Sequence, residues 1–285
     1  FITSLIGAPI MAIAPLTGSA TWNLALLWPG TIIAGSYLGV MAVSFVVITP
    51  NEMRARTRRV AREKGVLLVV DNTFTTPRAY RPFDHGADIV IHSVTKLLAG
   101  HSDVTLGYAV ARDAGLQKAI YDFAVTTGMT PSPFDCWLAE RGLATFDLRF
   151  DRAEQNAARL ADHLGTLAGV KRVLYPMRGD HPDAARARAV LGNRGCNMLS
   201  FELHGGREAA NAFAAAAEGI AFAPTLGDVG TTLSHPASSS HRALTPEARA
   251  AIGISEGFFR VSVGLEDSDA LADVFSRAVA AAETA

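Results

Sequence analysis

The stretch DIVIHSVTKLLAGHSD, residues 88–103, carries the side chains of this sequence that are best arranged for chemistry. Ser93 and Thr95 stand just before Lys96, and all three follow an apolar run. Further towards the N-terminus, Asp71 ends a second apolar run, VLLVVD. A lysine amine can form a Schiff base with a carbonyl compound, a carboxylate can pair with a cation, and hydroxyls can hydrogen-bond an anion.

These groups match what pyridoxal phosphate requires from a protein. Lys96 is expected to form the Schiff base and, once a substrate displaces it, to move protons between carbon atoms. Asp71 is expected to pair with the pyridine nitrogen, because unit charges about 4 Å apart interact by roughly 4 kcal/mol at an effective dielectric constant of about 20. The alternative is that Lys96 is an ordinary surface lysine and Asp71 a turn residue.

Apolar strands must place these groups at one edge of a sheet. The runs VLLVV (66–70), ADIVIHS (87–93) and VTLGYAVA (104–111) are predicted to be buried strands that alternate with helices. This pattern is typical of an α/β fold with a mostly parallel sheet and helices on both faces. Ligands of such sheets lie at the carboxyl ends of the strands, which both Asp71 and Lys96 follow. On an extended chain the hydroxyls of Ser93 and Thr95 would point the same way.

The lysine segment resembles the signature of the Cys/Met-metabolism pyridoxal-phosphate enzymes. This family includes cystathionine gamma-synthase, cystathionine lyases, methionine gamma-lyase and homoserine sulfhydrylases. Further stretches agree with the family in the same order, from about Arg59 to the C-terminus: VVDNTFTTP (69–77), TPSPFDCWLAERGL (130–143), and HPASSSH followed by FFRVSVGLED (235–267). The resemblance implies a fold-type-I enzyme that performs elimination or replacement on sulfur amino acids or homoserine esters. It also implies a homo-oligomer, a dimer or tetramer.

The resemblance also implies roles for single residues around the cofactor. Ser93 and Thr95 would hydrogen-bond its phosphate. Thr73 would contact Asp71 and help to hold it in place.

Two further residues are expected to contact the substrate. Arg260 in FFRVSVG would bind the α-carboxylate, because a guanidinium binds carboxylates in a bidentate manner. The alternative for Arg260 is a surface ion pair with Glu266 or Asp267. Thr225 stands where the family usually has a serine near the substrate carboxylate.

The chain is predicted to divide into four parts. Residues 1–50 form an apolar segment, residues 51–132 part of a cofactor-binding large domain, residues 133–167 one long bridging helix, and residues 168–285 a smaller α/β domain. The long helix begins with the capping pair Ser132-Pro133. In the last part, strands are expected at KRVLY, NMLSFEL and FFRVSVG, with helices near 207–217 and 268–282.

The beginning of the chain has a different composition from the rest. Residues 1–51 contain no Asp, Glu, Lys or Arg, and residues 31–49 are almost all apolar or small. Since about 20 such residues span a bilayer, a transmembrane segment is predicted. Residues 52–64 carry six basic and two acidic side chains, a flank expected on the cytoplasmic side. The phrase VVITPNEMRAR is similar to a loop of major-facilitator transporters. The alternative to a transmembrane segment is a buried strand-helix hairpin.

Residues 1–58 show no match to the Tyr-Ser-Arg segment, the Ser-Gly-Met phosphate loop or the stacking tyrosine of the family. We therefore expect an N-terminally truncated enzyme joined to a membrane segment. Two alternatives to an active enzyme stay open: a catalytically inactive fusion, and a soluble pseudoenzyme that joins a full-length relative as a subunit.

The overall composition excludes several other classes of protein. A net charge of −1 over 285 residues gives no reason to expect a nucleic-acid partner. The two cysteines, Cys136 and Cys196, form neither a disulfide framework nor a metal-ligand pattern, which favours the cytoplasm and no metal. Cys136 is expected to act as a small hydrophobic residue. Three histidines are assigned structural roles: His101, His235 and His241.

Overall fold

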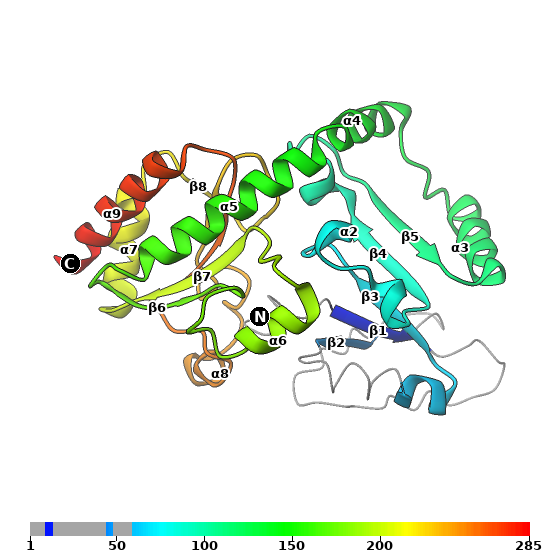
Figure 1. Cartoon of the computed structure of the whole chain (residues 1–285), viewed down its shortest axis with the longest axis horizontal. Helices are drawn as coiled ribbons and strands as arrows, with labels where there is room; N and C mark the ends of the chain where they lie inside the picture. Colours follow the sequence, from blue (N-terminus) through cyan, green and yellow to red (C-terminus); the bar gives the residue numbers. More distant parts are fainter. Residues whose placement is uncertain (1–8, 14–43, 48–58) are drawn as a thin grey trace.

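The computed structural model describes residues 9–13, 44–47 and 59–285 of the chain. They form two five-stranded sheets joined by helices (Figure 1). The first sheet has the order β2-β1-β3-β4-β5, with β2 at Ser44–Val47, β1 at Pro9–Ile13, β3 at Leu67–Asp71, β4 at Ile89–Ser93 and β5 at Gly107–Ala111. Residues 59–64 are helical, and Gly65, at φ 63°, ends that helix before β3 as its position suggested.

The prediction of a mostly parallel first sheet is wrong for the described strands. Only β3 and β4 run parallel, whereas β1 with β2, β1 with β3, and β4 with β5 are antiparallel. The reason lies in the connections: α2 (Thr76–Ala79) and η2 (Pro82–His85) carry the chain from the end of β3 back to the start of β4. The segment between β4 and β5 holds one short helical turn and returns directly, which gives an antiparallel pair.

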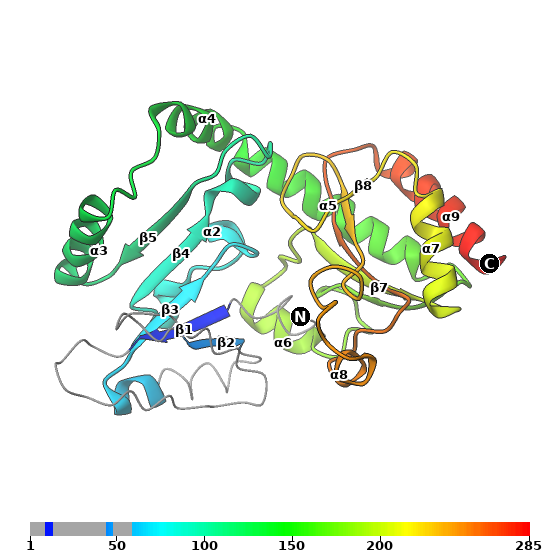
Figure 2. The same cartoon turned by 180° about the vertical axis from the view of Figure 1, so that it is seen from behind.

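The third predicted strand is also less buried than expected. β5 begins at Gly107 rather than Val104, and each of its residues is either exposed or half-buried. Helix α3 (Ala114–Thr126) was not predicted; it lies beside β5, as Figures 1 and 2 both show.

The second sheet belongs to the C-terminal part and has the order β6-β7-β10-β9-β8. Its strands are β6 (Val170–Leu174), β7 (Met198–Leu203), β8 (Ala221–Phe222), β9 (Thr232–Ser234) and β10 (Phe258–Ser262). β8 and β9 are parallel, and the other neighbouring pairs are antiparallel. The three strands predicted in this part are confirmed as β6, β7 and β10.

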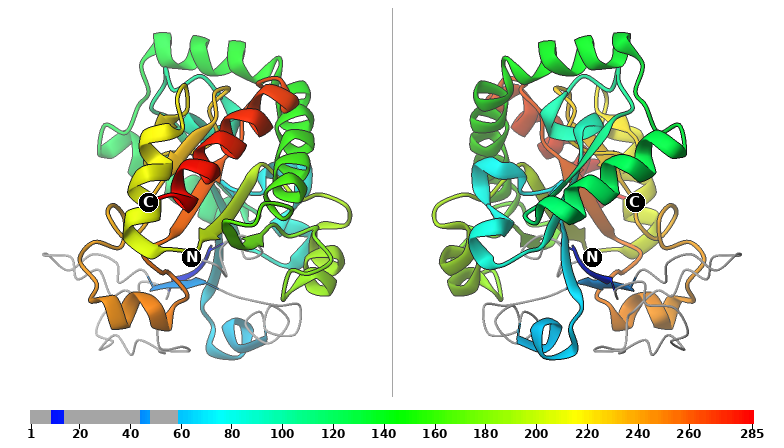
Figure 3. Two further views of the ribbon diagram at one scale, coloured as in Figure 1. Left: turned by 90° about the vertical axis from the view of Figure 1, so that its left-hand side faces the viewer. Right: turned by 90° about the vertical axis from the view of Figure 1, so that its right-hand side faces the viewer.

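Helices α5 (Phe146–Leu164), α7 (Gly206–Ala216) and α9 (Ser268–Glu283) build the largest core with this sheet. Figure 3 shows α7 and α9 side by side in front of the strands. Four fully buried phenylalanines pack against one another at the centre: Phe201, Phe213, Phe259 and Phe275. The helices predicted near 207–217 and 268–282 are confirmed as α7 and α9, whereas α6 (Ala184–Leu191) and α8 (Pro246–Ala251) were missed.

The single bridging helix predicted for residues 133–167 is two helices. α4 (Pro133–Leu143) ends before Ala144, and α5 starts at Phe146. Ser132 caps α4 as predicted, since its hydroxyl accepts a hydrogen bond from the Asp135 amide at 3.0 Å. The break occurs where Thr145 leaves helical geometry and its amide turns back to the carbonyl of Gly142, 3.3 Å away.

The apolar segment 1–50, with the membrane span predicted at residues 31–49, lies mostly outside the described residues. Its described pieces, 9–13 and 44–47, are the strands β1 and β2. Within the described part of the chain, no helix has the length and apolar character needed to cross a bilayer.

Candidate active site

The carboxyl ends of β3 and β4 bring Asp71 close to the segment that carries Lys96. The two strands are parallel, with Asp71 opposite Ile91, and the Asn72 amide donates to the Ile91 carbonyl at 2.9 Å. The chain continues from β4 directly into Lys96. Asp71 and Lys96 therefore follow neighbouring strands at one edge of the sheet, as predicted from the two apolar runs.

Thr73 ties these two strand ends together. Its amide and its hydroxyl both donate to Asp71 Oδ1, at 2.9 and 2.6 Å. The same hydroxyl accepts a hydrogen bond from the Ser93 amide at 2.9 Å. Thr73 is buried, so one side chain fixes the carboxylate on β3 relative to the end of β4.

Lys96 lies in the turn Val94–Leu98 rather than on an extended strand, and its own backbone, at φ −83° and ψ −136°, forms a kink within this turn. Thr95 is part of this turn, and its hydroxyl both accepts from the Leu106 amide at 2.9 Å and donates to the Leu106 carbonyl at 3.2 Å. The expectation that Ser93 and Thr95 share one face of a strand is therefore wrong. Since the chain turns immediately after β4, alternation along a strand no longer relates the two hydroxyls.

Lys96, Thr225 and Arg260 converge from distant parts of the sequence. The Lys96 amine donates to the Thr225 hydroxyl at 2.9 Å, across 129 residues of sequence. The Arg260 guanidinium donates to the Thr225 carbonyl at 3.2 Å, across 35 residues. Thr225 thus links the lysine of the first part to the arginine on β10 in the second sheet.

The alternative surface ion pair for Arg260 does not fit the structure. The Glu266 carboxylate instead accepts hydrogen bonds from the amide and hydroxyl of Thr231. Asp267 caps α9, accepting from the Asp269 and Ala270 amides at 3.0 Å.

Burial and charge both favour a neutral Lys96 amine. Burial is the main cause that lowers the pKa of Lys96, and the nearby positive charge of Arg260 lowers it further. Burial also lowers the pKa of Arg260, although a guanidinium stays charged at physiological pH. The site therefore pairs an amine biased towards its nucleophilic form with a fixed positive charge.

Two features that contact the Lys96 turn were missed by the sequence analysis. The first is the loop 225–231, in which Gly227 lies against the backbone of Lys96 and Leu97, and the Val229 amide donates to the Gly100 carbonyl at 2.8 Å. The second is Arg149 on α5, whose guanidinium reaches the carbonyls of the turn. In the sequence, the glycines of TLGDVG were the signal for the loop contact, and an arginine at a core position of a helix was the signal for the Arg149 contact.

The remaining polar residues have structural contacts. His101 Nδ1 lies 2.6 Å from the Ala99 carbonyl, and the two ring nitrogens of His235 lie 2.8 Å from Ser238 Oγ and the Glu256 carbonyl. The structural roles predicted for His101 and His235 are thus supported. Cys136, expected to act as a small hydrophobic residue within a helix, lies in α4 and is exposed.

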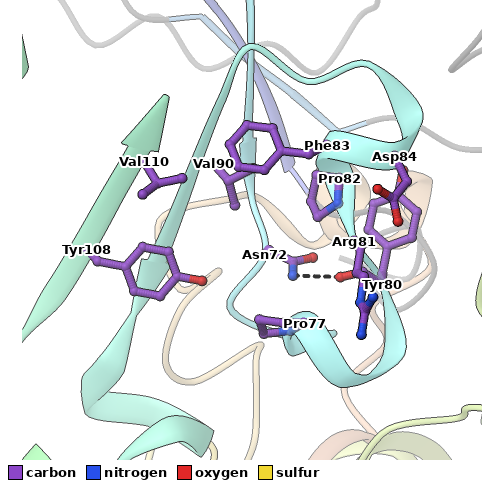
Figure 4. Close-up of a pocket in the computed structure, with 10 residues that line it drawn as sticks. All are labelled: Asn72, Pro77, Tyr80, Arg81, Pro82, Phe83, Asp84, Val90, Tyr108 and Val110. Atoms are coloured by element: carbon purple, nitrogen blue, oxygen red, sulfur yellow. Dashed lines mark hydrogen bonds between the residues drawn. The ribbon is translucent and has the colours of Figure 1, made fainter. Parts of the chain in front are cut away.

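A pocket of about 210 Å³ lies beside β4 and β5 of the first sheet, and Lys96, Thr225 and Arg260 are not among its lining residues (Figure 4). The Asn72 side chain beneath it donates to the Tyr80 carbonyl at 2.9 Å. Its lining is mostly apolar: Asn72, Pro77, Tyr80, Arg81, Pro82, Phe83, Asp84, Val90, Tyr108 and Val110.

The groups at the strand ends fit pyridoxal phosphate. Lys96 offers an amine for its aldehyde, and the half-buried Asp71 offers a carboxylate for its ring nitrogen. Both donors from Thr73 reach Oδ1 of Asp71, so among the described residues Oδ2 stays open to accept from a cation. Ser93 bonds Thr73 through its amide, so its hydroxyl is available to an anion, whereas that of Thr95 is held by Leu106.

Comparison with known proteins agrees with this chemistry. The family model for Cys/Met metabolism PLP-dependent enzymes matches residues 54–280. Cystathionine beta-lyase of Bacillus subtilis is 42% identical over 221 residues, which cover 78% of this chain and 56% of the relative. L-methionine gamma-lyase of Pseudomonas putida is 42% identical over 222 residues, covering 77% and 56%.

Solved structures give the same result for the fold. Cystathionine gamma synthase from Xanthomonas oryzae pv. oryzae, in complex with cystathionine, matches with a TM-score of 0.76 and 42% identity. The match covers 81% of this chain and 59% of that one. The chain thus has an α/β fold like that of the cystathionine synthases and lyases, and spans less than two thirds of the length of the relatives it matches.

Proposed function

The chain belongs to the Cys/Met metabolism PLP-dependent enzyme family, and we propose that it catalyses elimination or replacement on sulfur amino acids or homoserine esters. The observation that carries this proposal is the convergence of Lys96, Thr225 and Arg260, because it sets an amine beside a carboxylate-binding cation. An α-amino acid needs both groups: the cation binds its carboxylate, and the amine acts at its Cα.

The cofactor is pyridoxal 5′-phosphate, which the family uses. Lys96 would hold it covalently, Asp71 would pair with its ring nitrogen, and Ser93 would donate to its phosphate. When bound, it supplies an electron sink that stabilises negative charge at the substrate Cα. The role of Thr73 is to keep Asp71 in place through its two hydrogen bonds. Thr95 contributes by fixing the turn to Leu106, and any contact with the phosphate uses the remaining lone pair of its hydroxyl.

Lys96 would move the protons. With its pKa lowered by burial and by Arg260, a larger share of its amine is neutral near pH 7 and able to take the proton from Cα. The resulting ammonium can return that proton to a neighbouring carbon or to a leaving group. The Thr225 hydroxyl, 2.9 Å away, accepts a hydrogen bond from the amine and so orients it once it is released from the cofactor.

Arg260 would bind the substrate carboxylate. Its guanidinium is half-buried on β10, and a partly desolvated guanidinium binds a carboxylate more strongly than an exposed one. Thr225 holds it through a backbone carbonyl rather than a carboxylate, so its positive charge is not neutralised by that contact. The methyl group of Thr225, where relatives usually have serine, would narrow this side of the site.

The class of substrate follows from the relatives, whose names include cystathionine beta-lyase, L-methionine gamma-lyase and O-succinylhomoserine sulfhydrylase. All three act on amino acids with sulfur or an ester oxygen beyond Cα. We place the chain in the cytoplasm, since it uses cysteine sparingly and both thiols are free.

A homo-oligomer, a dimer or tetramer, is part of the proposal. Several large apolar side chains from α3 to the start of α5 are at least half exposed, including Phe123, Phe134, Trp137 and Leu148. Apolar patches of this kind are typical of subunit interfaces.

The direct test uses the purified full chain incubated with pyridoxal phosphate. We expect a visible absorbance band that borohydride removes by fixing the cofactor to the peptide containing Lys96. Cystathionine or methionine should then yield a keto acid and ammonia. Lys96→Ala is the matched control and should give neither result. Absence of a borohydride-fixed cofactor on the unmutated chain would refute the proposal.

A further inference from the structure

The turn that carries Lys96 ends with carbonyl groups that its own backbone cannot satisfy. The Ala99 amide donates to the Val94 carbonyl at 2.9 Å, and the Gly100 amide to the Lys96 carbonyl at 2.8 Å. The chain then leaves the turn at Gly100, whose φ is 78°. Leu97 and Leu98 stand before this exit, and no backbone amide of the described residues donates to their carbonyls, as is usual for the last carbonyls of a helical turn.

Arg149 supplies the missing donors. Its Nη1 donates to the Leu97 carbonyl at 2.9 Å, and its Nη2 to the Leu98 carbonyl at 2.8 Å. Nη2 also reaches the Gly142 carbonyl at 2.7 Å, and Nε reaches the Thr145 hydroxyl at 3.1 Å. All four acceptors are neutral, and the arginine is only 8% exposed. Burying a charge in this way is costly unless its hydrogen bonds are met, so these bonds determine where the guanidinium lies.

Two glycines make room for this contact. A Cβ on Gly100 would collide with the guanidinium, and a Cβ on Gly142 would lie 2.6 Å from the Ala99 carbonyl oxygen. The break between α4 and α5 contributes as well, since it directs the Gly142 carbonyl and the Thr145 hydroxyl at Arg149. Gly100, Gly142 and the helix break at Thr145 therefore together form the site that holds the Arg149 guanidinium against the turn.

We infer that Arg149 is a positioning residue for Lys96. It fixes the carboxyl end of the turn, while the loop 225–231 contacts the same turn through Gly227 and Val229. Because Arg149 and this loop hold the turn in place, the Lys96 amine stays 2.9 Å from the Thr225 hydroxyl. The part of this inference that concerns the cofactor rests on the proposed function; the part that concerns the turn does not.

The geometry requires arginine and not just a positive charge. The four acceptors diverge around one planar group, which a guanidinium can serve with several N–H bonds at once. A lysine ammonium has three donors on a flexible stem, so it would keep at most part of this set.

The test compares the full chain with Arg149→Met, Arg149→Lys and the control Arg159→Met, which removes an exposed arginine of the same helix. Without any cofactor, the pH dependence of amine labelling at Lys96 is followed by peptide mass spectrometry. We expect Arg149→Met to raise the pKa of Lys96 towards its ordinary value, because a loosened turn exposes the amine. The pKa of Lys96 in Arg149→Lys should lie between the values of Arg149→Met and the unmutated chain. In Arg159→Met it should match that of the unmutated chain.

Titration with pyridoxal phosphate is the second measurement. Arg149→Met should weaken binding by about tenfold or more, since a buried charged hydrogen bond contributes about 1.5–3 kcal/mol. If the unmutated chain takes up no cofactor but Arg149→Met still shifts the labelling curve, the proposed function fails and the positioning role stands. A labelling curve for folded Arg149→Met that coincides with the unmutated one overturns the inference. Loss of fold in both Arg149 variants also overturns it, because Arg149 would then act on general stability.

Discussion

The replacement Thr73→Val tests whether one hydroxyl couples the two strand ends of the site. Valine has nearly the shape of threonine, so packing at this buried position is preserved. The change removes the donor to Asp71 Oδ1 at 2.6 Å and the acceptor of the Ser93 amide at 2.9 Å. The Thr73 amide keeps its own bond to Asp71.

The expected cost follows from these two bonds. A hydrogen bond to a carboxylate contributes about 1.5–3 kcal/mol, and an amide left without an acceptor costs about 1–3 kcal/mol. Asp71 and Ser93 are half-buried, so water recovers part of both losses. We therefore expect the free energy of unfolding to fall by about 2–4 kcal/mol, near the lower part of the summed range.

Urea unfolding measures the total, and hydrogen exchange of the Ser93 amide measures the local part. Each 1.4 kcal/mol corresponds to about a tenfold faster exchange when opening is local. Thr73→Ser keeps the hydroxyl and is the matched control, with an exchange rate close to the unmutated chain. Unchanged exchange at Ser93 in Thr73→Val would show that the hydroxyl does not couple the strands.

Three further predictions concern Lys96 and Arg260. Lys96→Ala should abolish borohydride-fixed cofactor while the circular dichroism spectrum stays that of the unmutated chain. Burial and then Arg260 lower the pKa of folded Lys96, so between this folded pKa and 10.5 the unfolded chain binds more protons than the folded chain. The free energy of unfolding should therefore rise with pH across this range. Lys96→Met should flatten this rise in urea midpoints taken between about pH 7 and about pH 10. Arg260→Ala should weaken amino-acid binding by roughly ten- to hundredfold without loss of cofactor, as judged by titrating the cofactor absorbance with methionine, and an unchanged midpoint would exclude Arg260 from the substrate site.

Parts of the site were predictable from local sequence. The apolar runs before Asp71 and Lys96 predict two strands with polar residues at their carboxyl ends, and the structure pairs these strands in parallel. The contact of Thr73 with Asp71 was also expected. These inferences hold because each depends on a few adjacent residues.

Other parts depend on distant contacts that no local pattern carries. The apolar composition of β5 does not reveal its direction, which follows from the short return after the Lys96 turn. Residues 133–167 have good helical periodicity throughout, yet the helix breaks at Thr145, where the chain meets Arg149 and the turn. An isolated arginine in a helical sequence gives no sign that two of its acceptors lie about 50 residues earlier.

The partners of Lys96 bear on how the chain is synthesised. Arg149 and Thr225 lie 53 and 129 residues after it in the sequence, so the lysine leaves the ribosome long before either of them. Loops of this length close at a modest entropic cost, but only after the later segment has emerged and folded. Until those segments have emerged, the Lys96 amine lacks both the Thr225 hydroxyl and the nearby positive charge of Arg260 on β10, which lowers its pKa in the folded chain. A nascent chain arrested before residue 225 would carry the whole lysine motif without the Thr225 hydroxyl or the Arg260 charge that act on it in the folded protein.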